Sequence, residues 1–139
     1  MLTAPGFAQN PNIGTWKLDE AKSKIPAGVG KNTTVVYAAA SGDMIQVTTD
    51  GVDASGKATH TEWTGKFDKK PYPVTGDPTA DFRAYKPKGE RKLALANMKG
   101  DKTVSNGWID LAKDGKSRTV YFTYFGSKKV KAKYVYDKQ

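Results

Sequence analysis

The only histidine of the sequence, His60, has the most clearly defined potential for chemistry. It lies two residues before Glu62, and side chains two positions apart share one face of a β-strand. An imidazole beside a carboxylate is compatible with general base catalysis. The more ordinary explanation, which we favour, is a half-exposed histidine with an acidic neighbour on a strand.

The residue types give little support for metal or cofactor chemistry. One histidine and no cysteine are too few for a dedicated transition-metal site. The segment from Asp77 to Asp81 could offer oxygen ligands to calcium, but we favour turn chemistry, in which aspartates bond local backbone amides. No nucleophile elbow, phosphate loop or dinucleotide fingerprint occurs. We therefore expect no enzyme activity, no metal site and no cofactor.

Positive charge is the third chemical feature, because the formal net charge is +9. Such a field attracts polyanions, whether nucleic acid, acidic polysaccharide or an anionic membrane surface. Outward lysines also protect exposed strand edges, and we favour that explanation. The basic residues concentrate late in the chain, at Lys86, Lys88, Arg91, Lys92, Lys99, Lys102, Lys113, Lys116, Arg118, Lys128, Lys129, Lys131 and Lys133.

The composition favours a folded β domain over a disordered chain. The 139 residues are short of aliphatic side chains but hold 7 Tyr and 3 Trp, which disordered chains avoid and sheets favour. This length is typical of one domain. No apolar run approaches the ~18 residues that a transmembrane helix needs.

Short turn signals containing glycine separate segments rich in Thr, Val, Tyr and Phe, a pattern typical of an antiparallel meander. The clearest strand is the last, where Val130, Ala132, Tyr134 and Tyr136 alternate with polar residues. Residues 20–29 instead suggest a short helical turn near 19–25, and the three prolines of 69–78 predict an irregular loop. The predicted strands are 14–19, 32–40, 43–52, 57–68, 79–86, 90–99, 102–112, 116–126 and 128–137.

The first residues suggest export. Gly6, Phe7 and Ala8 form a small-x-small triplet after Pro5, as at the end of a secretory signal peptide. We expect residues 1–12 to be a truncated signal remnant and flexible arm, and 13–139 to be one domain. A short N-terminal arm without export is the alternative. A cysteine-free chain fits a periplasmic or secreted bacterial protein.

Motifs at the two ends of the domain resemble those of calycins, the lipocalins and fatty-acid-binding proteins. Gly14-Thr15-Trp16 resembles their G-x-W start, and 134–138 (YVYDK) resembles the closing segment of fatty-acid-binding proteins. The run as a whole is similar to small, uncharacterised lipocalin-like proteins exported by bacteria. The resemblance implies an up-and-down antiparallel barrel of eight to ten strands. The helical lid of fatty-acid-binding proteins is absent or reduced to a turn, because only some twelve residues separate Leu18 from Lys31.

Binding of a small, mostly apolar molecule inside this barrel is the function that the resemblance implies. Tyr134 stands where fatty-acid-binding proteins carry an anchoring arginine, so a carboxylate would need Arg83 or Arg118 instead. The alternative is an interaction or structural protein that binds a polyanion or another chain through its basic surface or strand edges. In a closed barrel nucleic-acid binding is not expected. The predicted ligand-binding residues are Trp63, Phe67, Phe82, Arg83, Tyr85, Trp108, Arg118, Phe122, Tyr124, Tyr134 and Tyr136.

Overall fold

The computed structural model describes residues 10–139, and within them the regular elements are all β-strands. No helix in this described part is long and apolar enough to cross a membrane. The signal-peptide remnant predicted at residues 1–8 lies outside it. The strands are β1 (Gly14–Lys24), β2 (Lys31–Ala39), β3 (Ile45–Val52), β4 (Ala58–Gly65), β5 (Tyr72–Thr75), β6 (Phe82–Pro87), β7 (Lys92–Lys99), β8 (Lys102–Leu111), β9 (Ser117–Tyr124) and β10 (Val130–Lys138).

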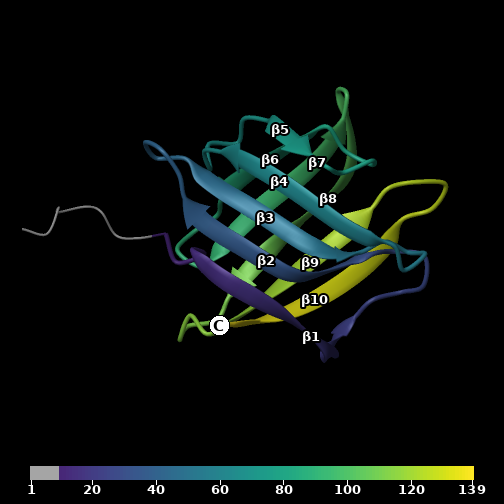
Figure 1. Cartoon of the computed structure of the whole chain (residues 1–139), viewed down its shortest axis with the longest axis horizontal. Helices are drawn as coiled ribbons and strands as arrows, with labels where there is room; N and C mark the ends of the chain where they lie inside the picture. Colours follow the sequence, from purple (N-terminus) through teal and green to yellow (C-terminus); the bar gives the residue numbers. More distant parts are fainter. Residues whose placement is uncertain (1–9) are drawn as a thin grey trace, which may run out of the picture.

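These ten strands form one closed barrel in which chain neighbours pair antiparallel (Figure 1). β10 closes the ring by pairing with β1, where Trp16 lies opposite Lys138 and Leu18 opposite Tyr136. The predicted all-β, up-and-down barrel is confirmed, and it is consistent with the calycin-like fold that the motifs imply. Every strand has a neighbour on both sides, so the lysines have no fully free sheet edge to protect.

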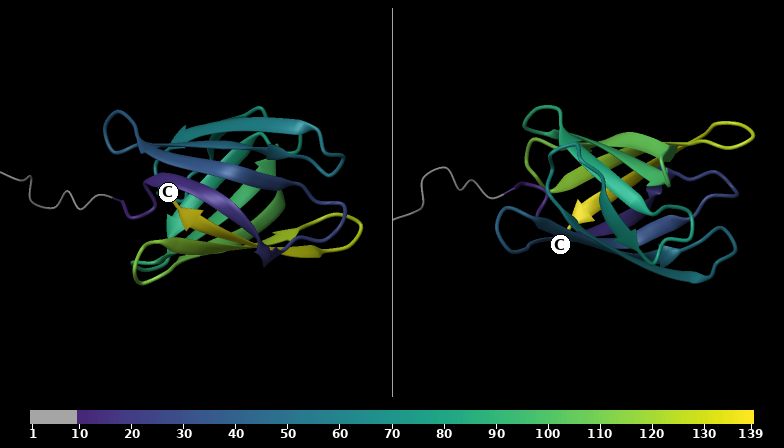
Figure 2. Two further views of the ribbon diagram at one scale, coloured as in Figure 1. Left: turned by 60° about the horizontal axis from the view of Figure 1, so that its bottom comes forward. Right: turned by 90° about the horizontal axis from the view of Figure 1, so that it is seen from above.

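The turns of an up-and-down barrel alternate between its two ends. Figure 2 shows the hairpin turns gathered at these two opposite ends. We name each end after a residue buried near it. The Trp16 end gathers segment 10–13, the C-terminus and the turns at 40–44, 66–71, 88–91 and 112–116. The Arg83 end gathers the turns at 25–30, 53–57, 76–81, 100–101 and 125–129.

Two segments differ from the sequence-based prediction. The helical turn expected near 19–25 is absent, because β1 continues to Lys24 after a register shift beyond Asp19. The Ser23 hydroxyl closes this irregularity by accepting the backbone N–H of Val135 at 2.9 Å. The proline-rich loop contains the four-residue strand β5. β5 tolerates Pro73 because it makes only two residue pairs with each neighbouring strand.

The barrel interior is filled by alternate residues of each strand, as period-two alternation requires. Rings dominate it: Trp16, Trp63 and Tyr85 are at most 1% exposed. Aliphatic residues such as Val47 and Ile109 fill the space between the rings. This packing supplies most of the apolar area that stabilises the fold. The few polar residues that also point inward are therefore the unusual feature of the interior.

Candidate functional site

A row of polar side chains crosses the inner wall near the Arg83 end. Arg83, Asn97, Ser105 and Tyr124 lie directly opposite one another on consecutive strands, from β6 to β9. Arg83 Nε donates to Asn97 Oδ1 at 2.8 Å, and Asn97 Nδ2 donates to Ser105 Oγ at 3.0 Å. All three residues are buried, so the strands themselves hold the guanidinium in place.

Two tyrosines continue this row towards β1. The Tyr124 and Tyr134 hydroxyls lie 2.8 Å apart, and the Tyr134 hydroxyl donates to the Gly30 carbonyl at 3.0 Å. Burial is the main cause that raises the pKa of both hydroxyls above the ordinary value. Both therefore stay protonated at neutral pH, and since Tyr134 donates to Gly30, Tyr124 is the donor in the bond between the two hydroxyls. We call Arg83, Asn97, Ser105, Tyr124 and Tyr134 the Arg83 band.

The Arg83 guanidinium is buried and forms no ion pair within residues 10–139, although the more distant Asp77 favours its charged form. Its relative exposure is 8%, and no carboxylate of residues 10–139 forms an ion pair with it. Besides Asn97 it bonds only the Tyr85 hydroxyl, through Nη1 at 3.3 Å. Within the described chain Nη2 makes no hydrogen bond. A buried charge costs several kcal/mol unless it is paired, so this geometry is suited to an incoming anion.

The second inward arginine, Arg118, is covered by aromatic rings instead. Its guanidinium carbon lies 4.7 Å from the ring centre of Trp16, 4.5 Å from Tyr37 and 5.6 Å from Tyr136. Cation–π attraction of this kind stabilises a desolvated cation by up to about 2 kcal/mol. Nη1 also reaches Asn12 Oδ1 at 3.5 Å, while Nε is buried without a partner among the described residues.

Segment 10–13 closes the Trp16 end over this arginine. The Trp16 indole donates to the Asn12 carbonyl at 2.9 Å, and the Ile13 amide donates to the Asn10 carbonyl at 3.0 Å. Asn12 is itself only 9% exposed. Arg118 is thus part of a plug, with its faces occupied, whereas Arg83 lies beside polar groups near the other end.

Between the two arginines the barrel is filled by a cluster of rings. Trp63 and Tyr85 pack edge to face with centres 4.7 Å apart, and Phe67 lies 4.9 Å from Tyr85. Tyr37 and Tyr72 extend the cluster. The predicted ligand-binding residues Trp63, Phe67 and Tyr85 therefore contact one another in the middle of the barrel and towards the Trp16 end.

The remaining aromatics of the predicted set divide between the two sides of the wall. Tyr134 and Tyr136 are buried inside, and Phe122 and Tyr124 point inward but are only half-buried, with their rings stacked 5.5 Å apart. Their partial exposure places them where solvent reaches the inner wall. Tyr136 donates to the Asn32 carbonyl at 2.7 Å, and burial raises the pKa of its hydroxyl.

The predicted inward position of Trp108 is wrong, and so is that of Phe82. The aliphatic neighbours Ile109 and Leu111 occupy the interior of β8, so alternation turns Trp108 outward, where it is 40% exposed. In β6 the interior positions belong to Arg83 and Tyr85, so Phe82 lies on the outer face.

Two hollows of the described structure lie at the Trp16 end. One, of about 540 Å³, is lined by residues 88–92 with Asp110 and Leu111. The other, of about 330 Å³, lies beside segment 10–12 and residues 87–93. Of the predicted ligand-binding residues, only Phe67 lines either hollow.

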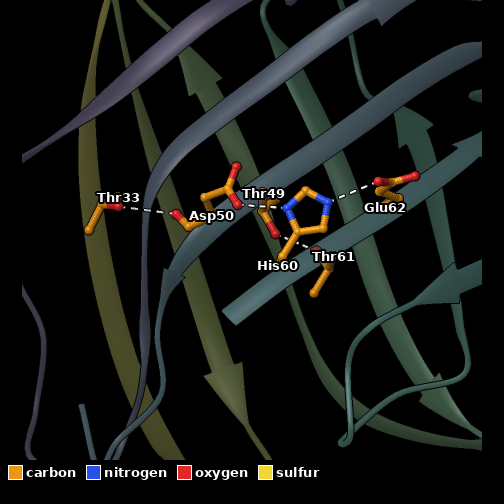
Figure 3. A network of polar contacts seen from close by, with 6 residues as sticks. All are labelled: Thr33, Thr49, Asp50, His60, Thr61 and Glu62. Carbon is orange, nitrogen blue, oxygen red and sulfur yellow. Dashed lines mark hydrogen bonds and ion pairs between the residues drawn. The ribbon is translucent and has the colours of Figure 1, made fainter. Parts of the chain in front are cut away.

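His60 lies outside the barrel, between two carboxylates (Figure 3). Its Nδ1 is 2.6 Å from Asp50 Oδ1 on β3, and its Nε2 is 2.9 Å from Glu62 Oε2. The hydrogen bond to Glu62, followed by that to Asp50, raises the pKa of His60. Since both ring nitrogens face carboxylates, neither offers a free lone pair to a substrate, which weakens the general-base interpretation.

Acidic residues elsewhere bond backbone amides, as the turn interpretation expects. Asp77 Oδ1 accepts the Thr79 amide at 2.8 Å, and Asp81 Oδ2 accepts the Gly100 amide at 3.0 Å. No cluster of three or more metal-ligating side chains is found within residues 10–139.

Sequence reasoning missed Asn97 and Ser105. A signal existed for the first, because Leu93, Leu95 and Asn97 share the inward face of β7, so a polar residue stands where alternation demands an apolar one. Ser105 carried no such signal, because a bulge opposite Asn97 and Met98 sets its register.

The chain matches no protein-family model, and no curated protein matches it. The geometry of the barrel and of its two ends therefore carries the functional argument.

Proposed function

We propose that this protein binds, without converting it, a small and mostly apolar molecule that carries one anionic group. The anion is held by Arg83 at the Arg83 end of the lipocalin-like barrel. The observation that carries the proposal is the buried guanidinium of Arg83, which has neutral hydrogen-bond partners but no ion pair within residues 10–139. An anionic ligand supplies the missing charge, and charge-assisted hydrogen bonds are stronger than neutral ones.

The surroundings of Arg83 support an amphipathic ligand. Phe122 and Tyr124 present half-buried rings on the inner wall, which suit an apolar body. Tyr134 adds a hydroxyl that stays protonated. Ligand sites of this type combine an apolar lining with a few placed polar groups.

Arg118 is excluded as the anchor by what covers it. Three rings surround its guanidinium, and Asn12 closes the space above it. A ligand anion would have to displace segment 10–13 to reach this guanidinium. Of the two arginines that the sequence offers as alternatives, Arg83 is therefore the proposed anchor and Arg118 is part of the plug at the Trp16 end.

Export to the bacterial periplasm or cell exterior is part of the same proposal. It is supported by the triplet Gly6, Phe7 and Ala8 and by the absence of cysteine. N-terminal sequencing of the protein from its source tests it, with a start close to Gln9 expected. A chain that retains residues 1–8 would contradict export by cleavage at this point.

Tryptophan emission tests ligand binding, because the Trp63 indole donates to the Arg83 carbonyl at 2.9 Å. Decanoate should change the emission at lower concentration than decanol, which has the same chain length but no charge. Arg83→Gln should remove this preference, while Lys57→Gln, at the same end but exposed, should keep it. Equal responses to both probes in the unmodified protein would overturn the proposal.

A further inference from the structure

Three basic turns that are distant in sequence meet at the Trp16 end. The up-and-down topology places 66–71, 88–91 and 112–116 at this end, and backbone hydrogen bonds join the first two to neighbouring strands. The Lys69 amide donates to Tyr85, and the Leu111 amide donates to Arg91. The exposed basic residues in and beside these turns are Lys66, Lys69, Lys70, Lys86, Lys88, Arg91, Lys92, Lys113 and Lys116.

The opposite end has a smaller excess. The basic residues in and directly beside its turns are Lys24, Lys31, Lys57, Lys99, Lys102, Lys128 and Lys129, against the acidic residues Asp53, Asp77, Asp81 and Asp101. The four turns of the Trp16 end carry only Asp43, Asp68, Glu90 and Asp114 against the basic residues named above. Of those basic residues only Lys66 forms an ion pair within the described chain, with Asp43 at 3.5 Å. The positive surplus is therefore larger at the Trp16 end, where all but one of the basic side chains lack an ion pair within the described chain.

This end is also hollowed where the charge is densest. The 540 Å³ hollow is lined by Lys88, Arg91 and Lys92 together with two carboxylates, Glu90 and Asp110. The second hollow shares Glu90 and Lys92 with it. A concave site with both signs of charge differs from a uniform lysine surface, because it offers acceptors as well as cations.

An exposed tryptophan adjoins the first hollow. Trp108 is the one large hydrophobic side chain of residues 10–139 that is exposed to solvent. Its indole donates to Asp110 Oδ2 at 3.1 Å, and Lys92 Nζ lies 5.1 Å from its ring centre. On the other side it stacks on Tyr121, with ring centres 4.9 Å apart. Trp108 thus lies beside the hollow, through its contacts with the lining residues Lys92 and Asp110.

We propose that this surface, the basic turns with the Lys88–Lys92 hollow and Trp108, binds an acidic oligosaccharide. Saccharide carboxylates or sulfates meet Lys88, Arg91 and Lys92, and sugar hydroxyls donate to Glu90 and Asp110. The apolar face of a sugar ring contacts the exposed edge of Trp108, because Lys92 and Tyr121 cover the two faces of the indole. A phosphodiester group itself offers acceptors alone, so it has no donor for the two carboxylates of the hollow, whereas a saccharide carries hydroxyl donors on every ring.

The test measures calorimetric affinity for a hexamer of galacturonic acid. The triple variant Lys88→Gln, Arg91→Gln and Lys92→Gln should bind about tenfold more weakly, since each exposed charge pair contributes up to ~1 kcal/mol. The matched control changes three lysines at the opposite end and should lose less than about twofold. Its substitutions are Lys57→Gln, Lys102→Gln and Lys128→Gln.

Trp108→Ala separates a saccharide site from simple attraction between charges. It should weaken hexamer binding about fivefold and leave retention on a sulfonate exchange column unchanged, since ring contacts contribute about 1 kcal/mol. Equal losses in both triple variants, or no binding of the hexamer, would overturn the proposal. Tighter binding of dT12 or of phosphatidylglycerol vesicles than of the hexamer would also overturn it. Arg83→Gln should not change this affinity, so the outcome is independent of the interior site.

Discussion

Each end of this barrel buries one arginine, and the two arginines have different surroundings. At the Trp16 end, Arg118 is surrounded by three rings and closed over by segment 10–13. At the Arg83 end, Arg83 bonds Asn97 and Tyr85 and has a nitrogen without a hydrogen bond to residues 10–139. Aromatic faces stabilise the Arg118 cation even though its Nε makes no hydrogen bond within residues 10–139, whereas Arg83 has only neutral hydrogen-bond partners and no rings over it to compensate. The comparison gives Arg118 a structural role inside the barrel and leaves Arg83 as the interior arginine that suits the proposed anionic ligand.

The largest effect that would sharpen this comparison is expected from Trp16→Ala. The substitution removes a fully buried ring, its contact with Arg118 and its bond to Asn12. Loss of a buried tryptophan costs about 3–5 kcal/mol of unfolding free energy. Urea unfolding followed by circular dichroism measures it. A loss below about 1 kcal/mol would show that the plug is not structural.

The two arginines should differ in a second experiment, replacement by methionine. Arg118→Met should lower the unfolding free energy by about 2 kcal/mol, because three ring contacts disappear. Arg83→Met should change it by less than about 1 kcal/mol in the ligand-free protein, since relief from burying a charge offsets the lost Asn97 bond. The same urea experiment tests both. If the order were reversed, Arg83 would be the structural arginine and the comparison would fail.

A smaller effect is expected from Tyr124→Phe in the Arg83 band. It removes one hydroxyl bonded to Tyr134 while keeping the ring on Phe122. The expected cost in unfolding free energy is about 1 kcal/mol. If the Arg83 band forms the ligand site, the affinity for decanoate should decrease by a larger free energy than the unfolding free energy does. An unchanged affinity would remove Tyr124 from the proposed lining.

The smallest effect belongs to His60, which lies away from both ends. Its folded pKa is raised above 6.5, so the contact with Asp50 and Glu62 adds stability that is fully present below pH 6.5. That stability is lost as pH rises through the raised pKa. The urea midpoint should therefore decrease more between pH 5.5 and pH 8.5 in the unmodified protein than in His60→Gln. An equal decrease of the urea midpoint in the two proteins would show that the contacts of His60 with Asp50 and Glu62 do not stabilise the fold.

The barrel itself was largely predictable from the sequence, because its signals are local. Glycine turns and the alternation of Val130, Ala132, Tyr134 and Tyr136 define hairpins without knowledge of distant contacts. β5 was not predictable, because a short strand containing Pro73 exists only between two strands already in place. Residues 19–24 extend strand β1 beside β10 and do not form the expected helical turn, because pairing with another strand overrides a weak helical propensity.

The candidate site was predictable only in part. Arg83 and Arg118 were both identified, but their different roles depend on what lies beside each, which spacing does not reveal. Trp108 was placed on the wrong side because a bulge in β8 and the competing aliphatic residues decide which alternate positions face inward. The charge of the Trp16 end emerges only when the topology brings turns together that are distant in sequence.

One measurement tests the difference between the ends most directly, a titration with decanoate followed by the Nε–H resonances of the three arginines. The arginines are Arg83, Arg91 and Arg118, and single Arg→Lys variants assign the signals. The Arg83 signal should shift in a saturable way, while those of Arg118 and Arg91 stay in place. A shift of the Arg118 signal, or no shift of the Arg83 signal under saturating decanoate, would contradict the account.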